Sequence, residues 1–259
     1  MKLPLYQVDA FTSRVFGGNP AAVCPLEAWL PDEKLQAIAL ENNLSETAFI
    51  VKEPTGWRVR WFTPSIEVDL CGHATLGAAY VLFHHLQSGM ERVEFASRSG
   101  PLVVTRDGDW LTLDFPSRPP KACAPPAGLA EALGATPRET LAARDLIAVF
   151  DSEAEVLALK PDMAKLAALE FFSVVPTAPG SDADFVSRFF GPRVGVPEDP
   201  VTGSSHCSLI PYWAQRLGKT SLFARQVSAR GGELKCELKG ERVRIAGRGV
   251  LYLEGRITV

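Results

Sequence analysis

The sequence has no hydrophobic run near the roughly 20 residues that a membrane-spanning helix needs. It has no basic block either, and its net charge is −3 at neutral pH. The first residues alternate polar and apolar side chains over too short a stretch for a signal peptide. We therefore expect a cytoplasmic protein whose partners include neither nucleic acid nor a membrane.

Several sequence signatures are also missing. There is no Gly-x-Gly-x-x-Gly and no P-loop, so nucleotide binding is not indicated. The regular β-α-β alternation of a doubly wound sheet does not occur. Cysteine is scarce and its count is odd, without a disulfide pattern, which indicates free thiols. The cysteines are Cys24, Cys71, Cys123, Cys207 and Cys236.

An internal repeat is present. Residues 61–83 and 189–213 each read as an aromatic strand ending near a proline, an acidic loop, a glycine, a polar capping residue and an amphipathic helix. Gly203 follows Gly72 by about 130 residues, the length of a small domain. Two similar halves usually face each other across a cleft, and both helix starts would then point free N–H groups at one anionic ligand.

The proline-rich stretch 116–126 is the best linker in the chain. We expect an N-terminal domain over 1–116 and a C-terminal domain over 117–259, whose final strand pairs back with the first domain. Each domain reads as mostly strand around one long helix, over 73–85 in the first and 204–217 in the second. The second domain is expected to have strands over 170–175 and 185–190, and residues 17–20 to form a turn.

Acidic and imidazole side chains lie near both helix starts. Glu46 begins an apolar strand, where burial would raise its pKa toward the range useful for proton transfer. His73 lies in the first helical turn, where the dipole disfavours a cation and favours a neutral ring. Asp199 precedes the second helix. Each also has a plain structural interpretation: a solvated or capping acid for Glu46, a packed core histidine for His73 and a turn residue for Asp199.

The second helix start suits an anion. Gly203, Ser204 and Ser205 offer backbone N–H groups and hydroxyls, which fit a carboxylate and ordinary N-capping equally well. Three other kinds of site are less favoured. A metal site from Cys71, His73, Asp199, His206 and Cys207 lacks the usual paired spacing. A serine hydrolase lacks a nucleophile elbow, and a two-thiol racemase lacks a cysteine at the second helix start.

Six motifs in order resemble the phenazine-biosynthesis-like isomerase family, which has the diaminopimelate epimerase-like fold. They span nearly the whole chain and are specific only in combination. The motifs are residues 8–12 (VDAFT), 18–23 (GNPAAV), 44–49 (LSETAF), 69–75 (DLCGHAT), 198–204 (EDPVTGS) and 225–232 (RQ through RGG). Residues 203–213 are closer to the broad branch of the family than to the phenazine enzyme itself.

The resemblance implies an α+β fold of two pseudo-symmetric halves, each a β-barrel wrapped around a central α-helix. It implies an isomerase that needs no metal or organic cofactor and forms a homodimer. Glu46 would be the general acid/base that moves a proton along a small carboxylate-bearing substrate, assisted by His73 and Asp199. The substrate-binding residues would be Asn19, Gly72, Ala74, Gly203, Ser204 and Ser205.

Two alternatives stay open. The first is an epimerase or racemase of the same fold, in which the Cys71 thiol would take part. The second is a catalytically idle protein that binds a small molecule in the same place. The sequence does not identify the substrate, although isomerase chemistry is better supported than any phenazine precursor.

Overall fold

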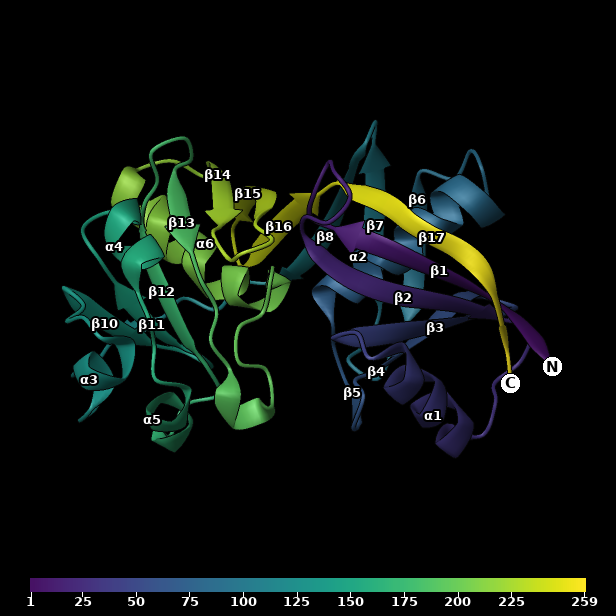
Figure 1. Ribbon diagram of the computed structural model, residues 1–259. Coiled ribbons are helices and arrows are strands. Elements are labelled where there is room, and N and C mark those ends of the chain that lie inside the picture. The colour runs from purple at the N-terminus through teal and green to yellow at the C-terminus, as the bar shows by residue number, and fades with distance from the viewer. The chain divides into compact units, whose positions relative to one another are not determined.

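The protein is described over residues 1–259 by a computed structural model. It divides into two compact units, Met1–Asp114 with Ala246–Val259 and Phe115–Ile245 (Figure 1). The first unit contains both chain ends, which lie side by side because β1 (Lys2–Ala10) pairs antiparallel with β17 (Gly249–Thr258). The backbone N–H of Val259 donates to the carbonyl of Met1 at 2.9 Å and extends this pairing to the last residue.

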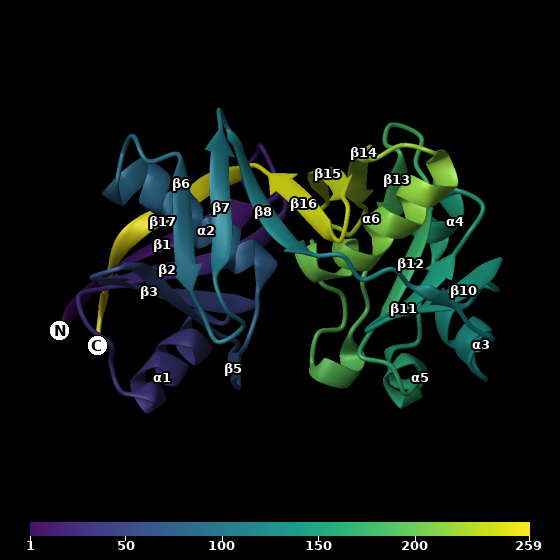
Figure 2. The same ribbon diagram turned by 180° about the vertical axis from the view of Figure 1, so that it is seen from behind.

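The first unit is mostly strand. Its other strands are β2 (Asn19–Leu26), β3 (Glu46–Glu53), β4 (Gly56–Phe62), β5 (Glu67–Val68), β6 (Arg92–Ala96), β7 (Leu102–Asp107) and β8 (Trp110–Pro116). Its helices are α1 (Asp32–Asn42) and α2 (Gly72–Val81), the latter continued by a π-helical turn (Leu82–Leu86). Seen from behind, β6, β7 and β8 run side by side over α2 (Figure 2).

The second unit has a similar composition. Its strands are β9 (Lys121–Ala122), β10 (Glu139–Ala142), β11 (Leu146–Val149), β12 (Val174–Pro179), β13 (Phe185–Ser187), β14 (Ser221–Gln226), β15 (Gly232–Lys239) and β16 (Arg242–Gly247). Its helices are α3 (Leu129–Leu133), α4 (Glu153–Ala158), α5 (Met163–Ala168), a 3₁₀ turn (Pro192–Val194) and α6 (Gly203–Leu217).

Both units pair their strands in the same order. In the first, β1–β2 is antiparallel, β2–β3 parallel, β3–β4 antiparallel and β4–β6 parallel. In the second, β10–β11, β11–β12, β12–β13 and β13–β14 follow the same alternation. The long helix enters at the same point of each series, α2 between β4 and β6 and α6 between β13 and β14. The sequence repeat is therefore a repeat of topology, and each half is a β-barrel wrapped around a central helix.

The central helices owe their position to their side chains. Nearly every residue of α2 is buried, and the helix contacts β1, β2, β3 and β17. Gly77 faces Ala21 and Val23, so a small residue lets the helix approach the strands closely. In α6, Trp213 stacks on Phe185 of β13, and its indole N–H donates to the Thr177 hydroxyl at 3.0 Å. α1 covers the other face of the first barrel with Leu35 and Ile38.

Some local expectations were wrong. The strand predicted over 170–175 begins only at Val174, and the one predicted over 185–190 ends at Ser187. The turn predicted over 17–20 ends early, because Asn19 and Pro20 already pair with β1. α4 and α5 were missed, although Ser152 and Glu155 form a capping box and Asp162 caps α5.

The five cysteines are free thiols, as expected from their odd count. Among the helices of the structure, none combines the length and the apolar character that crossing a membrane would require.

Candidate active site

Glu46 is the first residue of β3, immediately after the loop that leaves α1. It pairs in parallel register with Ala21 of β2, which faces α2 beside Gly77. Because paired residues of neighbouring strands share a face of the sheet, Glu46 points inward as well. Its side chain is only 17 % exposed. The start of the strand thus places a carboxyl group at the N-terminal end of the central helix.

The side chain that faces this carboxyl group is His73. It is the second residue of α2, and its Nε2 atom lies 3.1 Å from Glu46 Oε2. On the other side of the ring, the Asn19 side-chain amide nitrogen lies 3.1 Å from Nδ1. Cys71, the residue before the helix, places its sulfur 3.5 Å from the same Nδ1. The structure therefore brings together four residues from three elements.

The charges of Glu46 and His73 support each other. Burial acts to raise the pKa of Glu46, but the charge and hydrogen bond of His73 outweigh it and hold the pKa below its ordinary value. Burial acts against the charged imidazole, yet Cys71 and Glu46 together raise the pKa of His73 well above its ordinary value. Both directions favour the charged forms, a carboxylate on Glu46 and an imidazolium on His73.

This pair corrects two expectations from sequence. The pKa of Glu46 was expected to rise and is lowered, because an imidazole and not an apolar wall meets the carboxyl group. The ring of His73 was expected to be neutral because of the helix dipole, but the adjacent carboxylate is a closer and stronger charge. Asn19 can serve either form of the ring, since its amide offers an N–H donor at one end and a carbonyl acceptor at the other.

The Cys71 thiol lies in the same buried cluster. Burial and the nearby Glu46 carboxylate raise its pKa to about 11. The Cys71 side chain in turn contributes to the lowered pKa of the Glu46 carboxyl group. Glu46, Cys71 and His73 each also offer one possible metal ligand, and these atoms lie within 4.8 Å of one another.

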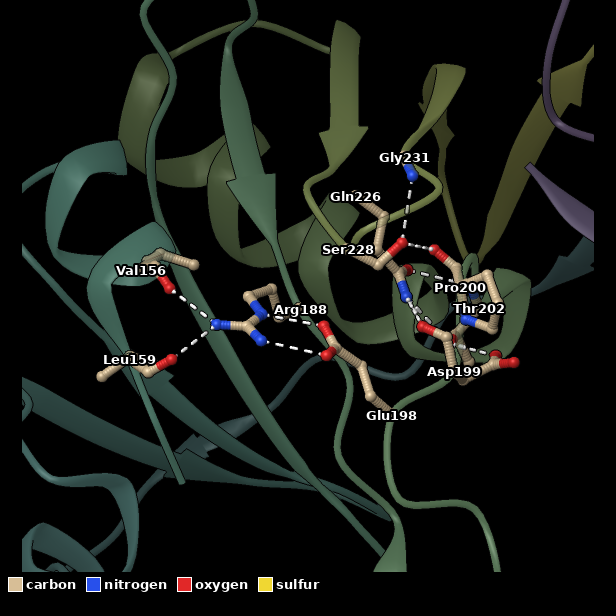
Figure 3. Close-up of polar contacts among 10 residues, drawn as sticks. All are labelled: Val156, Leu159, Arg188, Glu198, Asp199, Pro200, Thr202, Gln226, Ser228 and Gly231. Carbon is tan, nitrogen blue, oxygen red and sulfur yellow. Dashed lines mark hydrogen bonds and ion pairs between the residues drawn. The ribbon is translucent and has the colours of Figure 1, made fainter. Parts of the chain in front are cut away.

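The second unit carries Asp199 in the loop before α6 (Figure 3). Its residue is 9 % exposed, and its Oδ2 accepts a short hydrogen bond from the Thr202 hydroxyl. Gln226, at the end of β14, binds the backbone of both residues. Just before Asp199, Glu198 forms a two-point ion pair with Arg188 at 2.8 and 2.9 Å. Asp199 is thus a buried acid in a firmly held loop, more than a solvated turn residue.

The start of α6 has the small residues expected there. Gly203 is the first helical residue, and Ser204 is only partly buried. The hydroxyl of Ser205 donates to the Thr202 carbonyl at 2.9 Å, so it does not cap the helix. His206 donates from Nδ1 to the same carbonyl at 2.8 Å, and burial lowers its pKa to about 4. His206 is therefore a neutral residue in the core of the second unit.

The predicted site residues thus fall into two groups. Asn19, Glu46, Gly72, His73 and Ala74 surround the start of α2 in the first unit, and Asp199 and the residues 203–205 surround the start of α6 in the second. Reasoning from sequence missed the support around Asp199, namely Thr202, Gln226 and Arg188. A buried glutamine at a strand end is the signal that could have revealed it, since buried polar side chains are nearly always hydrogen-bonded.

Solved structures with the same fold are known. A phenazine biosynthesis protein of the PhzF family from Enterococcus faecalis is 48 % identical, covers all of both chains and superposes with a TM-score of 0.98. A probable proline racemase from Agrobacterium radiobacter is only 12 % identical, covers 99 % of this chain and 92 % of its own, and has a TM-score of 0.66. The second likeness concerns the fold alone, which is that of the epimerases and racemases.

Similar sequences are also known, and they identify the family. An uncharacterized isomerase of Pseudomonas aeruginosa is 57 % identical over 257 residues, which cover 99 % of each chain. The family model described as phenazine biosynthesis-like protein matches residues 8–255. This match confirms the resemblance drawn from the six motifs, and the chain belongs to the phenazine biosynthesis-like (PhzC-PhzF) protein family.

Proposed function

We propose that this protein is an isomerase that moves a proton within a small unsaturated or amino carboxylic acid by general acid/base catalysis, without a metal or organic cofactor. The observation that carries the proposal is the buried contact of 3.1 Å between Glu46 and His73 at the start of α2. A buried carboxylate beside an imidazole is an arrangement suited to general acid/base catalysis.

Glu46 is the proton carrier in this proposal. Its carboxylate takes a proton from one carbon of the substrate, and the electron pair left behind spreads into the conjugated carboxylate. The carboxylic acid so formed returns the proton to another carbon, so the substrate keeps its formula and nothing is oxidised. His73 favours the ionised form of Glu46 before the transfer, and it can stabilise charge during it because its Nε2 atom lies 3.1 Å from Glu46 Oε2.

The remaining predicted residues bind and assist. Backbone N–H groups at the start of a helix favour an anion, so Gly72 and Ala74 in α2 and the residues 203–205 in α6 are proposed to hold the substrate's carboxylate. Asn19 orients the His73 ring through its contact with Nδ1. Asp199 is proposed to assist the proton transfer, in keeping with its burial before α6.

An epimerase is the second candidate, favoured by one observation. The Cys71 sulfur lies 3.5 Å from His73 Nδ1, so a thiol that can donate a proton lies beside the Glu46–His73 pair. With a pKa of about 11 the thiol can give a proton to a carbanion, but it is seldom ionised to remove one. This asymmetry favours Glu46 as the base. Loss of activity in Cys71→Ser with activity kept in Glu46→Gln would favour epimerisation.

A homodimer in the cytoplasm belongs to the same proposal. Its support is the family membership, and the contacts within one chain do not bear on it. Light scattering at micromolar concentration measures the mass in solution, and a mass equal to one chain would contradict the dimer.

The experiment begins with a thermal-shift screen of small unsaturated and amino carboxylic acids. Each compound that stabilises the protein is then incubated with it in deuterated water, and deuterium at carbon is followed by NMR. The proposal expects at least one compound to gain deuterium and to form an isomer of the same mass apart from the label. Binding of several such acids without any exchange at carbon would instead support an idle binding protein.

A further inference from the structure

Gln226 uses both ends of its buried side-chain amide in the loop that carries Asp199. The residue is 1 % exposed. Its carbonyl oxygen accepts from the backbone N–H of Thr202 at 2.8 Å, and its NH₂ group donates to the backbone carbonyl of Asp199 at 2.8 Å. A backbone N–H can only donate and a backbone carbonyl can only accept. These two contacts therefore assign the oxygen and the nitrogen of the Gln226 side-chain amide.

The fixed amide in turn fixes the Thr202 hydroxyl. The same NH₂ group of Gln226 lies 3.2 Å from Thr202 Oγ1 and donates to it. The hydroxyl thus accepts on one side and has its own proton left to donate. That proton points to Asp199 Oδ2, which accepts it in a hydrogen bond. The chain runs in one direction, from the Gln226 amide through the Thr202 hydroxyl to the Asp199 carboxylate (Figure 3).

The surrounding loop is held on both sides of Asp199. The Glu198 carboxylate is clamped by Arg188, whose guanidinium also donates to the carbonyls of Val156 and Leu159 at 3.3 and 3.0 Å. On the other side, the Ser228 hydroxyl donates to the carbonyl of Pro200 at 2.9 Å. Because the backbone is fixed at both neighbours of Asp199, the hydroxyl of Thr202 meets the carboxylate in one geometry.

We infer that Thr202 and Gln226 are positioning residues, which orient the Asp199 carboxylate at the start of α6 through one directed chain of hydrogen bonds. The inference rests on the proposed function only for the claim that Asp199 assists catalysis. A hydrogen bond donated to a carboxylate favours its charged form, and an oriented hydroxyl loses little entropy in doing so.

The test follows the titration of Asp199 itself by NMR, in protein with ¹³C-labelled aspartate carboxyl groups. Asp199→Asn identifies the signal by its loss. Thr202→Val keeps the shape and removes the hydroxyl, so the titration midpoint of Asp199 should move to higher pH by about one unit. Thr202→Ser restores the hydroxyl and should restore the midpoint. Gln226→Glu replaces the donor by an acceptor, which draws the Thr202 proton away, and should move the midpoint in the same direction as Thr202→Val.

A matched control separates positioning from stability. Thr140 has a buried hydroxyl in the same unit, which donates to the Cys123 carbonyl at 2.7 Å. Thr140→Val removes one buried hydrogen bond without touching Asp199, so it should lower the unfolding temperature like Thr202→Val but leave the midpoint unchanged. An unchanged midpoint in folded Thr202→Val and Gln226→Glu would overturn the inference.

The result is separable from the proposed function. Should a compound from the screen exchange its protons, Thr202→Val should move the acid limb of the pH–rate profile upward, and Thr202→Ser should not. Exchange in the wild type with the midpoint unmoved in Thr202→Val contradicts the hydrogen-bond chain alone. A moved midpoint in a protein that exchanges no substrate contradicts the isomerase alone.

Discussion

At the scale of single residues, the contact of Glu46 with His73 links stability to chemistry. Both side chains are largely buried, with 17 % of Glu46 and 6 % of His73 exposed. Removing one partner of a buried ion pair strongly destabilises the folded protein, because the other charge is left buried and unpaired. The same burial that makes the pair costly to break also keeps water away from the proton it shares. The pH dependence of the unfolding free energy therefore reports on the charges of this pair, and it can be measured before any substrate is known.

His73→Gln should lower the free energy of unfolding by about 3 kcal/mol where both charges are present. The lowered pKa of Glu46 contributes stability above its ordinary value of 4.5, lost as the pH falls through the folded-state pKa. The raised pKa of His73 contributes stability below its ordinary value of 6.5, lost as the pH rises through the folded-state pKa. Urea unfolding from pH 4 to 9 should therefore show the largest difference between about pH 4.5 and 6.5.

His84→Gln is the control for this measurement. Burial and the charge of Arg106 lower the pKa of His84, so its removal should not give a maximum in that window. A difference between wild type and His73→Gln that stays flat across the pH range would contradict the charged pair.

At the scale of elements, the sequence predicted which strands and helices form better than it predicted their first and last residues. The alternation of apolar and polar side chains predicts strands over 92–96, 102–106 and 110–115. β6, β7 and β8 match these ranges to within one residue, because the alternation reflects one buried face. β2 starts inside the predicted turn over 17–20, since β1 pairs with Asn19 and Pro20, residues that local chemistry assigns to a turn. Glu46 could be found as a site residue, but its partner His73 and hence its charge depend on contacts across elements.

Gly77 in α2 and Gly247 at the end of β16 should respond differently to alanine. A Cβ on Gly247 would lie 2.2 Å from the Phe11 ring, which is fully buried and cannot move aside. A Cβ on Gly77 would lie 3.5 Å from Ala21, an ordinary contact. Gly247→Ala should therefore cost about 2 kcal/mol of unfolding free energy. Gly77→Ala should be neutral or gain up to about 1 kcal/mol from helix propensity. Equal losses in the two variants, measured by urea unfolding, would contradict the packing described around α2.

At the scale of the whole molecule, one topology is used twice, and the chain end returns to complete the first copy. The two copies have diverged in the chemistry at their helix starts. The first has a cysteine, a histidine and a glutamate in contact, whereas the second has serines and an aspartate held by Thr202 and Gln226. The repeat therefore supplies the framework, and a few side chains at the helix starts supply the difference on which the proposed reaction depends.

The central claim, that Glu46 carries a proton to and from the substrate, is tested most directly by deuterium exchange in Glu46→Gln. The variant keeps the shape of the side chain and removes the titrating group, and circular dichroism checks that it is folded. With any compound that the wild type labels in deuterated water, Glu46→Gln should lose at least about 100-fold in exchange rate. Exchange that persists in Glu46→Gln and disappears in Cys71→Ser would contradict the claim and assign the proton to the thiol.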